Sequence, residues 1–441
     1  MLRSYEIAAP AATAVIPPPA SATRRTPQIT TISTISAIST ITAVSTIPSA
    51  PTAPAIPAIP TISAASTTPH ASHGAGPPGL PLRTLLRRYR NAGDPVSCEP
   101  VAQGLLNRGY RLRTTHGAYF LKHHLDGDHV SIARQHRATQ RLQKLGVPVA
   151  PPVESADGDT VAVIGGRCYA LHPWIEGRHR DGAELTADAS RRLGGLLGLV
   201  HTRLDEVMEP SLADSPATGP AYGATAHPAA GPATGPANSP TALSRLSELP
   251  YLSPDPADTL ALIDELLLLA RGRTHADVFD RLAEHRLVER RGLLERHAHR
   301  RPPPGAVPAT GWVHGDFHPL NLLYRGAEPA AIVDWDRLGV QPRAEEVVRA
   351  AAIFFVRPTG ELELTKVRAY ARAYRSAAGT CAAELAAAVH RVWWERLNDF
   401  WILRWRYQLD DRRADPLFAA VSALAVWWTR EYDAVCEAFA G

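Results

Sequence analysis

The residues that decide the fold lie in one stretch, GWVHGDFHPLNLLYRGAEPAAIVDWD, residues 311–336. Its polar side chains stand at fixed intervals in an otherwise apolar sequence. His314, Asp316 and Asn321 come first, and an apolar segment then ends in Asp334, thirteen residues after Asn321. The segments GWVHGD, NLLY and AAIVDWD are predicted to be short strands joined by loops. A single Asp or Asn in a loop is usually a turn residue, but the joint pattern indicates a functional site.

The spacing of these residues matches a known catalytic arrangement. In protein kinases a loop Asp accepts the proton of the attacking hydroxyl, and an Asn five positions later holds Mg²⁺. Asp316 and Asn321 have this spacing. We therefore expect Asp316 to be the catalytic base and Asn321 and Asp334 to be the metal ligands, because Mg²⁺ prefers hard oxygen donors. Asp336 is expected to point elsewhere or to support the site indirectly.

The two histidines of the stretch allow a second interpretation, a zinc site. His314 and His318 are four residues apart, which is the spacing of the zinc ligands in one family of proteases. That arrangement requires a helix and a Glu after the first His, whereas Gly315 and Pro319 disfavour a helix here. We expect both histidines to be loop scaffolding.

Composition separates the chain into parts of different character. Residues 1–80 form a low-complexity segment, with Ile or Val at every third position between Ile29 and Ile47. A period of three suits neither a helix nor a strand, so we expect a disordered or polyproline-like extension, although a start codon assigned too far upstream would also produce it. A second biased patch within residues 207–250 is predicted to be an insertion or linker.

Other compositional features limit the class of protein. Among 441 residues the net charge is only +4 and the basic residues are spread out, so charge alone does not suggest nucleic acid as a partner. The four cysteines form no CxxC pair, and neither a secretory signal nor a membrane helix is a good match, so a cytoplasmic location is expected. Only three lysines occur, Lys122, Lys144 and Lys366, which suggests that a lysine is retained where Arg would not serve.

The remaining sequence predicts an α+β fold of two lobes. Residues 81–175 are predicted to contain a short helix, a hairpin that turns at His116 and Gly117, a helix with Ile132, Leu142 and Leu145 inward, and two further strands. This small antiparallel β lobe, with the second helix packed on it, is followed by a larger, mostly helical lobe over residues 176–441. The cleft between two such lobes is the expected site.

The stretch HGDFHPLN…IVDWD resembles the signature of the aminoglycoside phosphotransferase and choline kinase superfamily, which are small-molecule kinases with a protein-kinase-like fold. The resemblance covers nearly all of residues 82–439. NRGYRLRTTHGAYFLK is similar to the first hairpin of that family, YALHPWIEGR to its interlobe hinge, and LGGLLGLVHTRL to the helix that opens its larger lobe.

The resemblance implies ATP and Mg²⁺ as cofactors and assigns further residues. Lys122 would contact the ATP phosphates, which would account for a lysine at this position, although a solvated lysine at a strand end is the alternative. The backbone of residues 170–174, with Ala170, His172 and Trp174, would bind adenine. Gly104 would let the first hairpin approach the phosphates.

Two departures from the family pattern affect the expected activity. The Glu that commonly pairs with the lysine is replaced by Gln135, so either activity is reduced or another acid substitutes. The Asp that often follows the metal-binding loop is replaced by Glu346. No GxGxxG, HRD arginine or APE-like segment occurs, which argues against a protein kinase.

The acceptor is the least determined part. Trp394, Leu397, Trp401 and Trp405 are predicted to form one helical stripe, which is more typical of core than of a cage that holds a cation with Glu395 and Asp399. The leading hypothesis is an ATP- and Mg²⁺-dependent kinase for a hydroxyl of an aminoglycoside-, choline- or homoserine-like molecule. The alternative is a kinase-like binding or structural protein with weak or no catalysis. The oligomeric state stays open.

Overall fold

A computed structural model of the protein describes residues 77, 79–101, 107–125, 129–208, 253–303 and 309–441. All of these residues belong to one compact unit, Ser36–Gly441. Almost all of the predicted low-complexity extension and Gly104 lie outside the described residues, as does most of the predicted insertion. The helix before that insertion continues to Met208 and buries Val207, so residues 207 and 208 belong to the helix.

The first part of the chain forms a five-stranded antiparallel sheet with strand order β1-β2-β3-β5-β4. The hairpin turn between β2 and β3 is confirmed, because the amide of Thr114 donates to the carbonyl of Gly117 at 2.8 Å. The elements are α1 (Leu82–Leu86), β1 (Pro95–Val101), β2 (Arg108–Thr114), β3 (Ala118–His124), α2 (His129–Lys144), β4 (Ala162–Ile164) and β5 (Arg167–Pro173).

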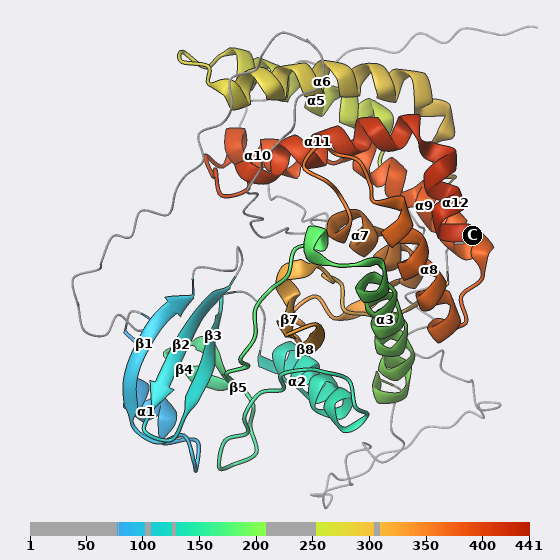
Figure 1. Ribbon diagram of the computed structural model, residues 1–441. Coiled ribbons are helices and arrows are strands. Elements are labelled where there is room, and N and C mark those ends of the chain that lie inside the picture. Colours follow the sequence, from blue (N-terminus) through green and yellow to red (C-terminus); the bar gives the residue numbers. More distant parts are fainter. Residues whose placement is uncertain (1–76, 78, 102–106, 126–128, 209–252, 304–308) are drawn as a thin grey trace, which may run out of the picture. The chain divides into compact units, whose positions relative to one another are not determined.

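The two faces of this sheet have different neighbours, because side chains alternate along each strand. One face, with Leu112, Leu121 and Leu171, packs against Leu85 and Leu86 of α1 in an apolar core. Lys122, His124 and His172 alternate with these residues and lie on the other face. The predicted helix α2 meets this other face through His136, whose ring lies beside those of His124 and His172. The prediction is incomplete rather than wrong, since α1 covers the apolar face (Figure 1).

Helix α2 lies between the sheet and the helical part. Ile132 and Leu142 are buried, as predicted, but Leu145 is 37% exposed. Leu145 follows the last helical residue, Lys144, and Gly146 has φ +80°, so the chain has left the helix before Leu145 could face inward. The guanidinium of Arg141 donates to the carbonyl of Val207 at 2.9 Å, which ties α2 to the larger part.

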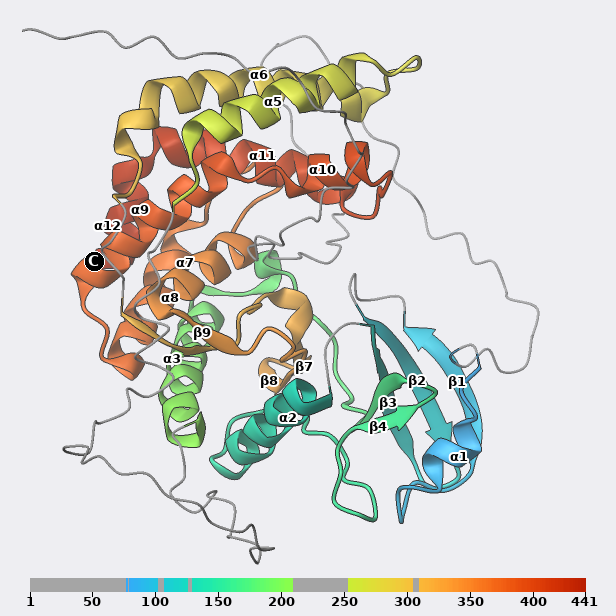
Figure 2. The same cartoon turned by 180° about the vertical axis from the view of Figure 1, so that it is seen from behind.

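The larger part is mostly helical, as predicted. Figures 1 and 2 show α5 and α6 side by side on one flank and α3 against α8 on another. Its helices are α3 (Ala187–Met208), α5 (Pro256–Arg271), α6 (Val278–His297), α7 (Arg343–Phe354), α8 (Leu364–Ala378), α9 (Ala382–Asn398), α10 (Trp401–Gln408), α11 (Asp415–Arg430) and α12 (Tyr432–Ala440), with short 3₁₀ turns η1 (Gly182–Glu184), η2 (Ala298–Arg300) and η3 (Pro319–Asn321).

Two small two-stranded sheets carry the stretch of residues 311–336. Strand β6 (Thr310–Val313) pairs with β9 (Gly339–Pro342), and β7 (Leu322–Arg325) pairs with β8 (Glu328–Ile332), both antiparallel. The predicted strands in this stretch are therefore confirmed. The polar residues lie in the loops between the strands, where the backbone is free to aim their side chains at one place.

The tryptophans near the C-terminus belong to the core, as predicted, but not to one helical stripe. Helix α9 ends at Asn398 and α10 begins at Trp401, so Trp394 and Trp401 lie on different helices. Trp394 is completely buried, and Trp405 is partly exposed. The acids of the suggested cage are engaged elsewhere, because Glu395 pairs with Arg349 at 2.7 Å and Asp399 with Arg396 at 3.6 Å. The cage interpretation is wrong.

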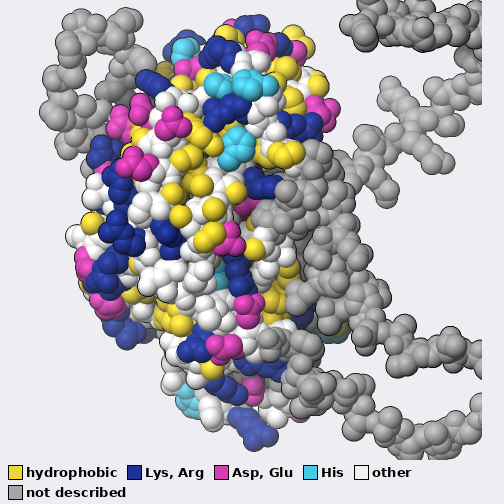
Figure 3. Space-filling view, turned by 90° about the vertical axis from the view of Figure 1, so that its right-hand side faces the viewer, with side chains coloured by type: hydrophobic (Ala, Val, Ile, Leu, Met, Phe, Trp, Pro, Cys, Tyr) yellow, Lys and Arg dark blue, Asp and Glu magenta, His cyan; other side chains and the backbone are white. Residues whose placement is uncertain are grey.

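The surface of the described part carries charges of both signs. On the face seen in Figure 3, Lys and Arg side chains are interspersed with Asp and Glu side chains. Among the helices of the described residues, none is both long and apolar enough to cross a membrane.

Candidate active site

A cavity of about 580 Å³ is lined by residues of the sheet, of α2 and of the loops between β6 and β9. This volume is in the range of small-molecule sites, about 300–1,000 Å³. The cavity brings together Lys122, Asp316, Asn321 and Asp334, together with His172 and Trp174 of the strand β5 region. Ala170 is buried and is not among the lining residues, and Gly104 lies outside the described residues.

The loop after β6 is held by its own histidines. The buried His314 accepts from the amide of Asp316 at 3.2 Å and contacts the carbonyl of Val333 at 3.0 Å through its other nitrogen. His318 accepts from the amide of Leu320 at 3.2 Å. Burial lowers the pKa of His314, although the Glu346 charge opposes this, so the imidazole is held neutral. Both histidines therefore bond the loop backbone, as expected for scaffolding.

Gly315 has a conformation that only glycine adopts easily here. Its φ is +83°, and a Cβ atom would lie 2.2 Å from the carbonyl oxygen of Arg337. A side chain at this position would push the loop away from the segment that follows Asp336. The close approach keeps the loop of Asp316 beside the loop of Asp334 and Asp336.

The side chain of Asp316 is only 10% exposed, yet one of its oxygens has no hydrogen-bond partner among the described residues. The other oxygen lies 3.5 Å from His318 Nε2 and 3.9 Å from Arg337 Nε. The backbone carbonyl of Asp316 accepts from Asn321 Nδ2 at 2.8 Å, which turns the Asn321 oxygen toward the cavity. The geometry thus leaves a buried carboxylate oxygen without a partner and an amide oxygen beside the cavity.

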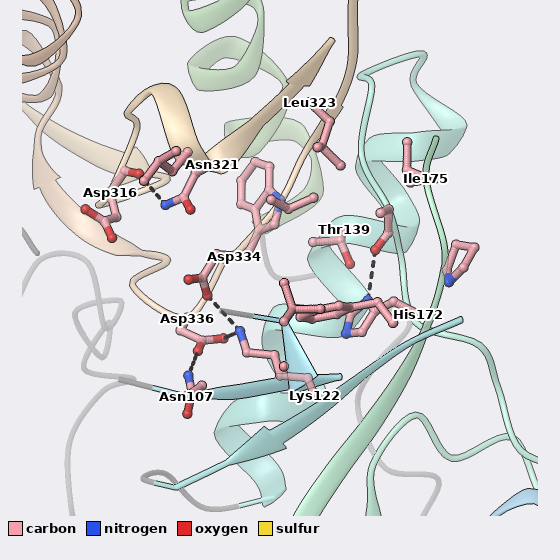
Figure 4. A pocket seen from close by; sticks show the side chains of 18 of the residues that line it. Asn107, Lys122, Thr139, His172, Ile175, Asp316, Asn321, Leu323, Asp334 and Asp336 are labelled. Atoms are coloured by element: carbon pink, nitrogen blue, oxygen red, sulfur yellow. Dashed lines mark hydrogen bonds and ion pairs between the residues drawn. The ribbon is translucent and has the colours of Figure 1, made fainter. Parts of the chain in front are cut away.

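Lys122 lies between two carboxylates (Figure 4). Its Nζ is 2.7 Å from Asp334 Oδ1 and 2.7 Å from Asp336 Oδ1. Burial alone would lower the pKa of Lys122, but the two carboxylates raise it above its ordinary value, so the ammonium stays charged. For the acidic Asp334 the sign is opposite: burial alone would raise its pKa, but the charge of Lys122 holds the pKa well below its usual range.

Asp334 has an uncommon backbone conformation, with φ +61°. Such a conformation in a residue other than glycine often marks a functional site. Its side chain remains 43% exposed while it pairs with Lys122. The expectation that Asp336 points away is wrong, because Asp336 contacts Lys122 directly. Burial and the Asp334 charge raise the pKa of Asp336, against the opposing effect of Lys122.

A buried network supports the loop from behind. The amide of Gly315 donates to Glu346, whose other oxygen lies 2.6 Å from His201 Nε2, and His201 Nδ1 lies 2.9 Å from the hydroxyl of Tyr374. Burial alone would raise the pKa of Glu346, but His201 and the Gly315 amide lower it. His201 and Tyr374 were not predicted from the sequence. The only sequence signal was a lone His among apolar residues in LGGLLGLVHTRL.

One wall of the cavity is aromatic and neutral. His124, His136 and His172 line it. The ring centroid of His136 lies 6.1 Å from that of His124 and 5.6 Å from that of His172. Burial lowers the pKa of His124 to about 3, of His136 to about 2 and of His172 to about 4. His172 Nδ1 lies 2.9 Å from the carbonyl of Ala150, so that nitrogen carries the proton. His124 and His136 were not predicted as lining residues, because only the packing of α2 on the sheet brings them together with His172.

The donor atoms present fit a magnesium ion bound together with phosphates. In the described residues no group of three or more His, Cys, Asp and Glu side chains could hold a metal alone. Magnesium usually takes one or two protein carboxylates and completes its shell with phosphates and water. Asp334 and the oxygen of Asn321 supply hard donors of this kind.

The comparisons with known proteins agree with this geometry. A model of the "Phosphotransferase enzyme family" matches residues 97–380, so the chain belongs to that family. No curated protein matches the sequence significantly.

Solved structures show the same fold. A spectinomycin phosphotransferase in complex with ADP and spectinomycin is 14% identical, with a TM-score of 0.50 over 78% of this chain and 96% of that chain. A choline kinase from Cryptosporidium parvum is 10% identical, with a TM-score of 0.46 over 81% of this chain and 98% of that chain. The match to the spectinomycin phosphotransferase indicates a shared fold, which in this chain is an antiparallel sheet followed by a larger helical part.

Proposed function

We propose that the protein transfers the γ-phosphoryl group of ATP to a hydroxyl group of a small molecule, with Mg²⁺ as the metal. The observation that carries the proposal is that Lys122 and Asp334 face Asp316 and Asn321 across one cavity (Figure 4). Phosphoryl transfer depends mainly on positioning and on neutralising charge. A buried ammonium, a free carboxylate oxygen and two hard metal ligands supply these functions.

In the proposed reaction Asp316 accepts the proton of the acceptor hydroxyl through its unpartnered oxygen. The acceptor oxygen forms a bond to the γ-phosphorus while the bond to the β,γ-bridging oxygen breaks, so the products are the phosphorylated acceptor and ADP. Lys122 binds the phosphates, and Asp334 and Asn321 would hold the metal, which supplies charge neutralisation when bound. The neighbouring Arg337 adds positive charge beside Asp316.

Strand register suggests which backbone groups bind the base. The amide of Trp174 donates to the carbonyl of Ala118 at 3.2 Å, and His172 and Ala170 stand opposite Phe120 and Lys122. Hydrogen-bonded pairs alternate in an antiparallel ladder, so the backbone groups of these three β5-side residues are directed toward β3. In place of the backbone of Ala170, His172 and Trp174, we propose that two neighbouring groups bind adenine. These are the carbonyl of Pro173 and the amide of Ile175. Both residues line the cavity.

Replacing Asp316 by Asn tests the proposal. We expect turnover to fall by about 10²–10⁴-fold, the usual contribution of a catalytic base, while nucleotide affinity changes little. ATP consumption would be measured against a panel of aminoglycosides, amino alcohols and other hydroxyl-bearing metabolites. Asp159→Asn, an exposed loop position, is the matched control. A fully active Asp316→Asn enzyme would contradict the assignment.

The alternative, a kinase-like binding protein without catalysis, is tested by the same set. This alternative was suggested by Gln135, which replaces the Glu that commonly pairs with the lysine. Asp336 nevertheless gives Lys122 a second carboxylate partner beside Asp334. Wild-type protein that binds nucleotide and consumes no ATP with any acceptor would favour that alternative. Because the acceptor pocket is not identified by these residues, the choice among aminoglycoside-, choline- and homoserine-like acceptors rests on the panel.

A further inference from the structure

Asp336 connects three separate elements around the lysine (Figure 4). Its Oδ1 accepts from Lys122 of β3 at 2.7 Å, and its Oδ2 accepts from the amide group of Asn107, just before β2. Its backbone carbonyl accepts from Gln135 Nε2 of α2 at 2.9 Å. Asn107 is itself tied down, since its oxygen accepts from the amide of Leu125 at 3.1 Å. The carboxylate of Asp336 is therefore fixed by bonds on both of its oxygens.

Helix α2 offers no acid that could hold Lys122. Its sequence, HVSIARQHRATQRLQK, contains neither Asp nor Glu. In protein kinases the corresponding lysine is held by a helix Glu, and the pair must be formed for activity. Gln135 of α2 lines the same cavity as Lys122, and its side-chain amide donates to the backbone carbonyl of Asp336. The helix thus holds the acid and does not supply it.

The other carboxylate beside Lys122 has a competing role. Asp334 is the residue that would bind the metal, and its side chain is 43% exposed against 28% for Asp336. A metal on Asp334 withdraws negative charge from Lys122, because the same carboxylate is then shared with a dication. Asp336 has no such competing demand, since both its oxygens are already bonded within the protein.

We propose that Asp336 is the positioning residue for Lys122 and keeps its ammonium directed at the phosphates when Asp334 binds the metal, with Asn107 fixing the Asp336 carboxylate and Gln135 fixing its backbone. The inference rests on the proposed function for its catalytic consequence, but the Lys122–Asp336 pair is testable without any nucleotide. The competing possibility is that Asp336 is itself a metal ligand.

The pair is tested by urea unfolding of the ligand-free protein. In the wild-type background Asp336→Asn should lower the unfolding midpoint, because Lys122 loses one of its two carboxylates. In a Lys122→Met background the same change should raise the midpoint, because it removes repulsion between Asp334 and Asp336. Lys144→Met, an exposed lysine of α2, is the matched control background. An equal effect of Asp336→Asn in all backgrounds would overturn the proposed pair.

The role of the pair is tested by metal binding and kinetics. Asp336→Asn should lower kcat roughly tenfold to a hundredfold, as expected for a residue that orients a reactive group. Mn²⁺ binding to the enzyme–nucleotide complex, measured by electron paramagnetic resonance, should change less than about twofold, whereas Asp334→Asn should weaken it at least about tenfold. A similar loss of Mn²⁺ affinity in both variants would make Asp336 a ligand and overturn the proposal. Wild-type protein that binds no Mn²⁺–nucleotide would contradict the proposed function. The unfolding data would still show whether Lys122 and Asp336 form a stabilising ion pair.

Discussion

The two ends of the cavity are built in opposite ways. The phosphate end consists of charged groups that neutralise one another, with Lys122 between Asp334 and Asp336. The second part, called the base end after the nucleotide base, consists of neutral rings. It includes the three histidines His124, His136 and His172, whose pKa values burial has lowered. One end therefore depends on ion pairs and the other on the exclusion of charge. Perturbing charge should damage the phosphate end by breaking pairs and the base end by creating an uncompensated charge.

At neutral pH, the largest expected effect within this comparison comes from Glu346, behind the phosphate end. Glu346→Gln should reduce the free energy of unfolding by about 1.5–3 kcal/mol, because hydrogen bonds to a buried charged group contribute that much. The catalytic loop should also shift, since Gly315 loses its charged acceptor, and kcat should fall. Urea unfolding and steady-state kinetics would measure both effects.

Glu284→Gln is the control for this change. Glu284 forms a surface ion pair with Arg271 at 2.7 Å, with both side chains substantially exposed, and such pairs contribute little to stability. Equal destabilisation by the two substitutions would show that the Glu346 network does not support the loop.

The base end predicts a pH dependence of stability. The folded-state pKa values of about 3 for His124 and about 2 for His136 lie below the unfolded value of about 6.5, so the unfolded chain binds protons first. Stability is therefore complete above about pH 6.5 and is lost as the pH falls toward 4, by up to about 1.4 kcal/mol per pH unit for each histidine. Urea unfolding at pH 7, 6 and 5 measures the slope.

Replacement of one histidine sharpens this prediction. His136→Gln should reduce the slope, because Gln does not titrate and can still bond the hydroxyl of Thr160, which lies 2.9 Å from His136 Nδ1. The exposed His285 of α6 is the control, and His285→Gln should leave the slope unchanged. A slope that is the same in both variants would mean that His136 is not held neutral by burial.

The smallest expected effect concerns His172 and the nucleotide. His172→Leu should raise the KM for ATP by a few-fold while kcat stays near the wild-type value. Contacts to the base are the same in the ground state and the transition state, so they alter binding more than the chemical step. His116→Leu, at the exposed hairpin turn, is the control. A large loss of kcat would show that the base end also positions the phosphates.

Much of the candidate site was predictable because it lies close together in the sequence. Asp316, Asn321 and Asp334 follow one another within a single stretch, and the spacing of such loop residues reflects local backbone geometry. The strands β6, β7 and β8 were predicted for the same reason, since short apolar segments alternate with loops, whereas β9 and its pairing with β6 were not predicted. The single helical stripe of tryptophans was predicted less well, because the break between α9 and α10 at residues 399 and 400 interrupts an otherwise regular apolar pattern.

Other parts of the site were not predictable because they depend on residues far apart in the chain. Gln135 and Asp336 are separated by 201 positions, and nothing local in the sequence links them. The pairing of His201 with Glu346 spans 145 positions and needs the packing of α3 against α7 and α8. The strand register of β3 and β5, rather than the hinge sequence, decides which backbone groups face the cavity.

The sequence by itself determined the family, the α+β architecture and the candidate residues Asp316, Asn321 and Asp334, because local spacing and periodicity specify loops, strands and helices. The tertiary structure decided how Lys122 is held, which imidazoles line the cavity and that the tryptophans are divided between two helices. Those outcomes depend on the distance between groups brought together by folding, and electrostatic and packing energies are set by that distance rather than by sequence separation.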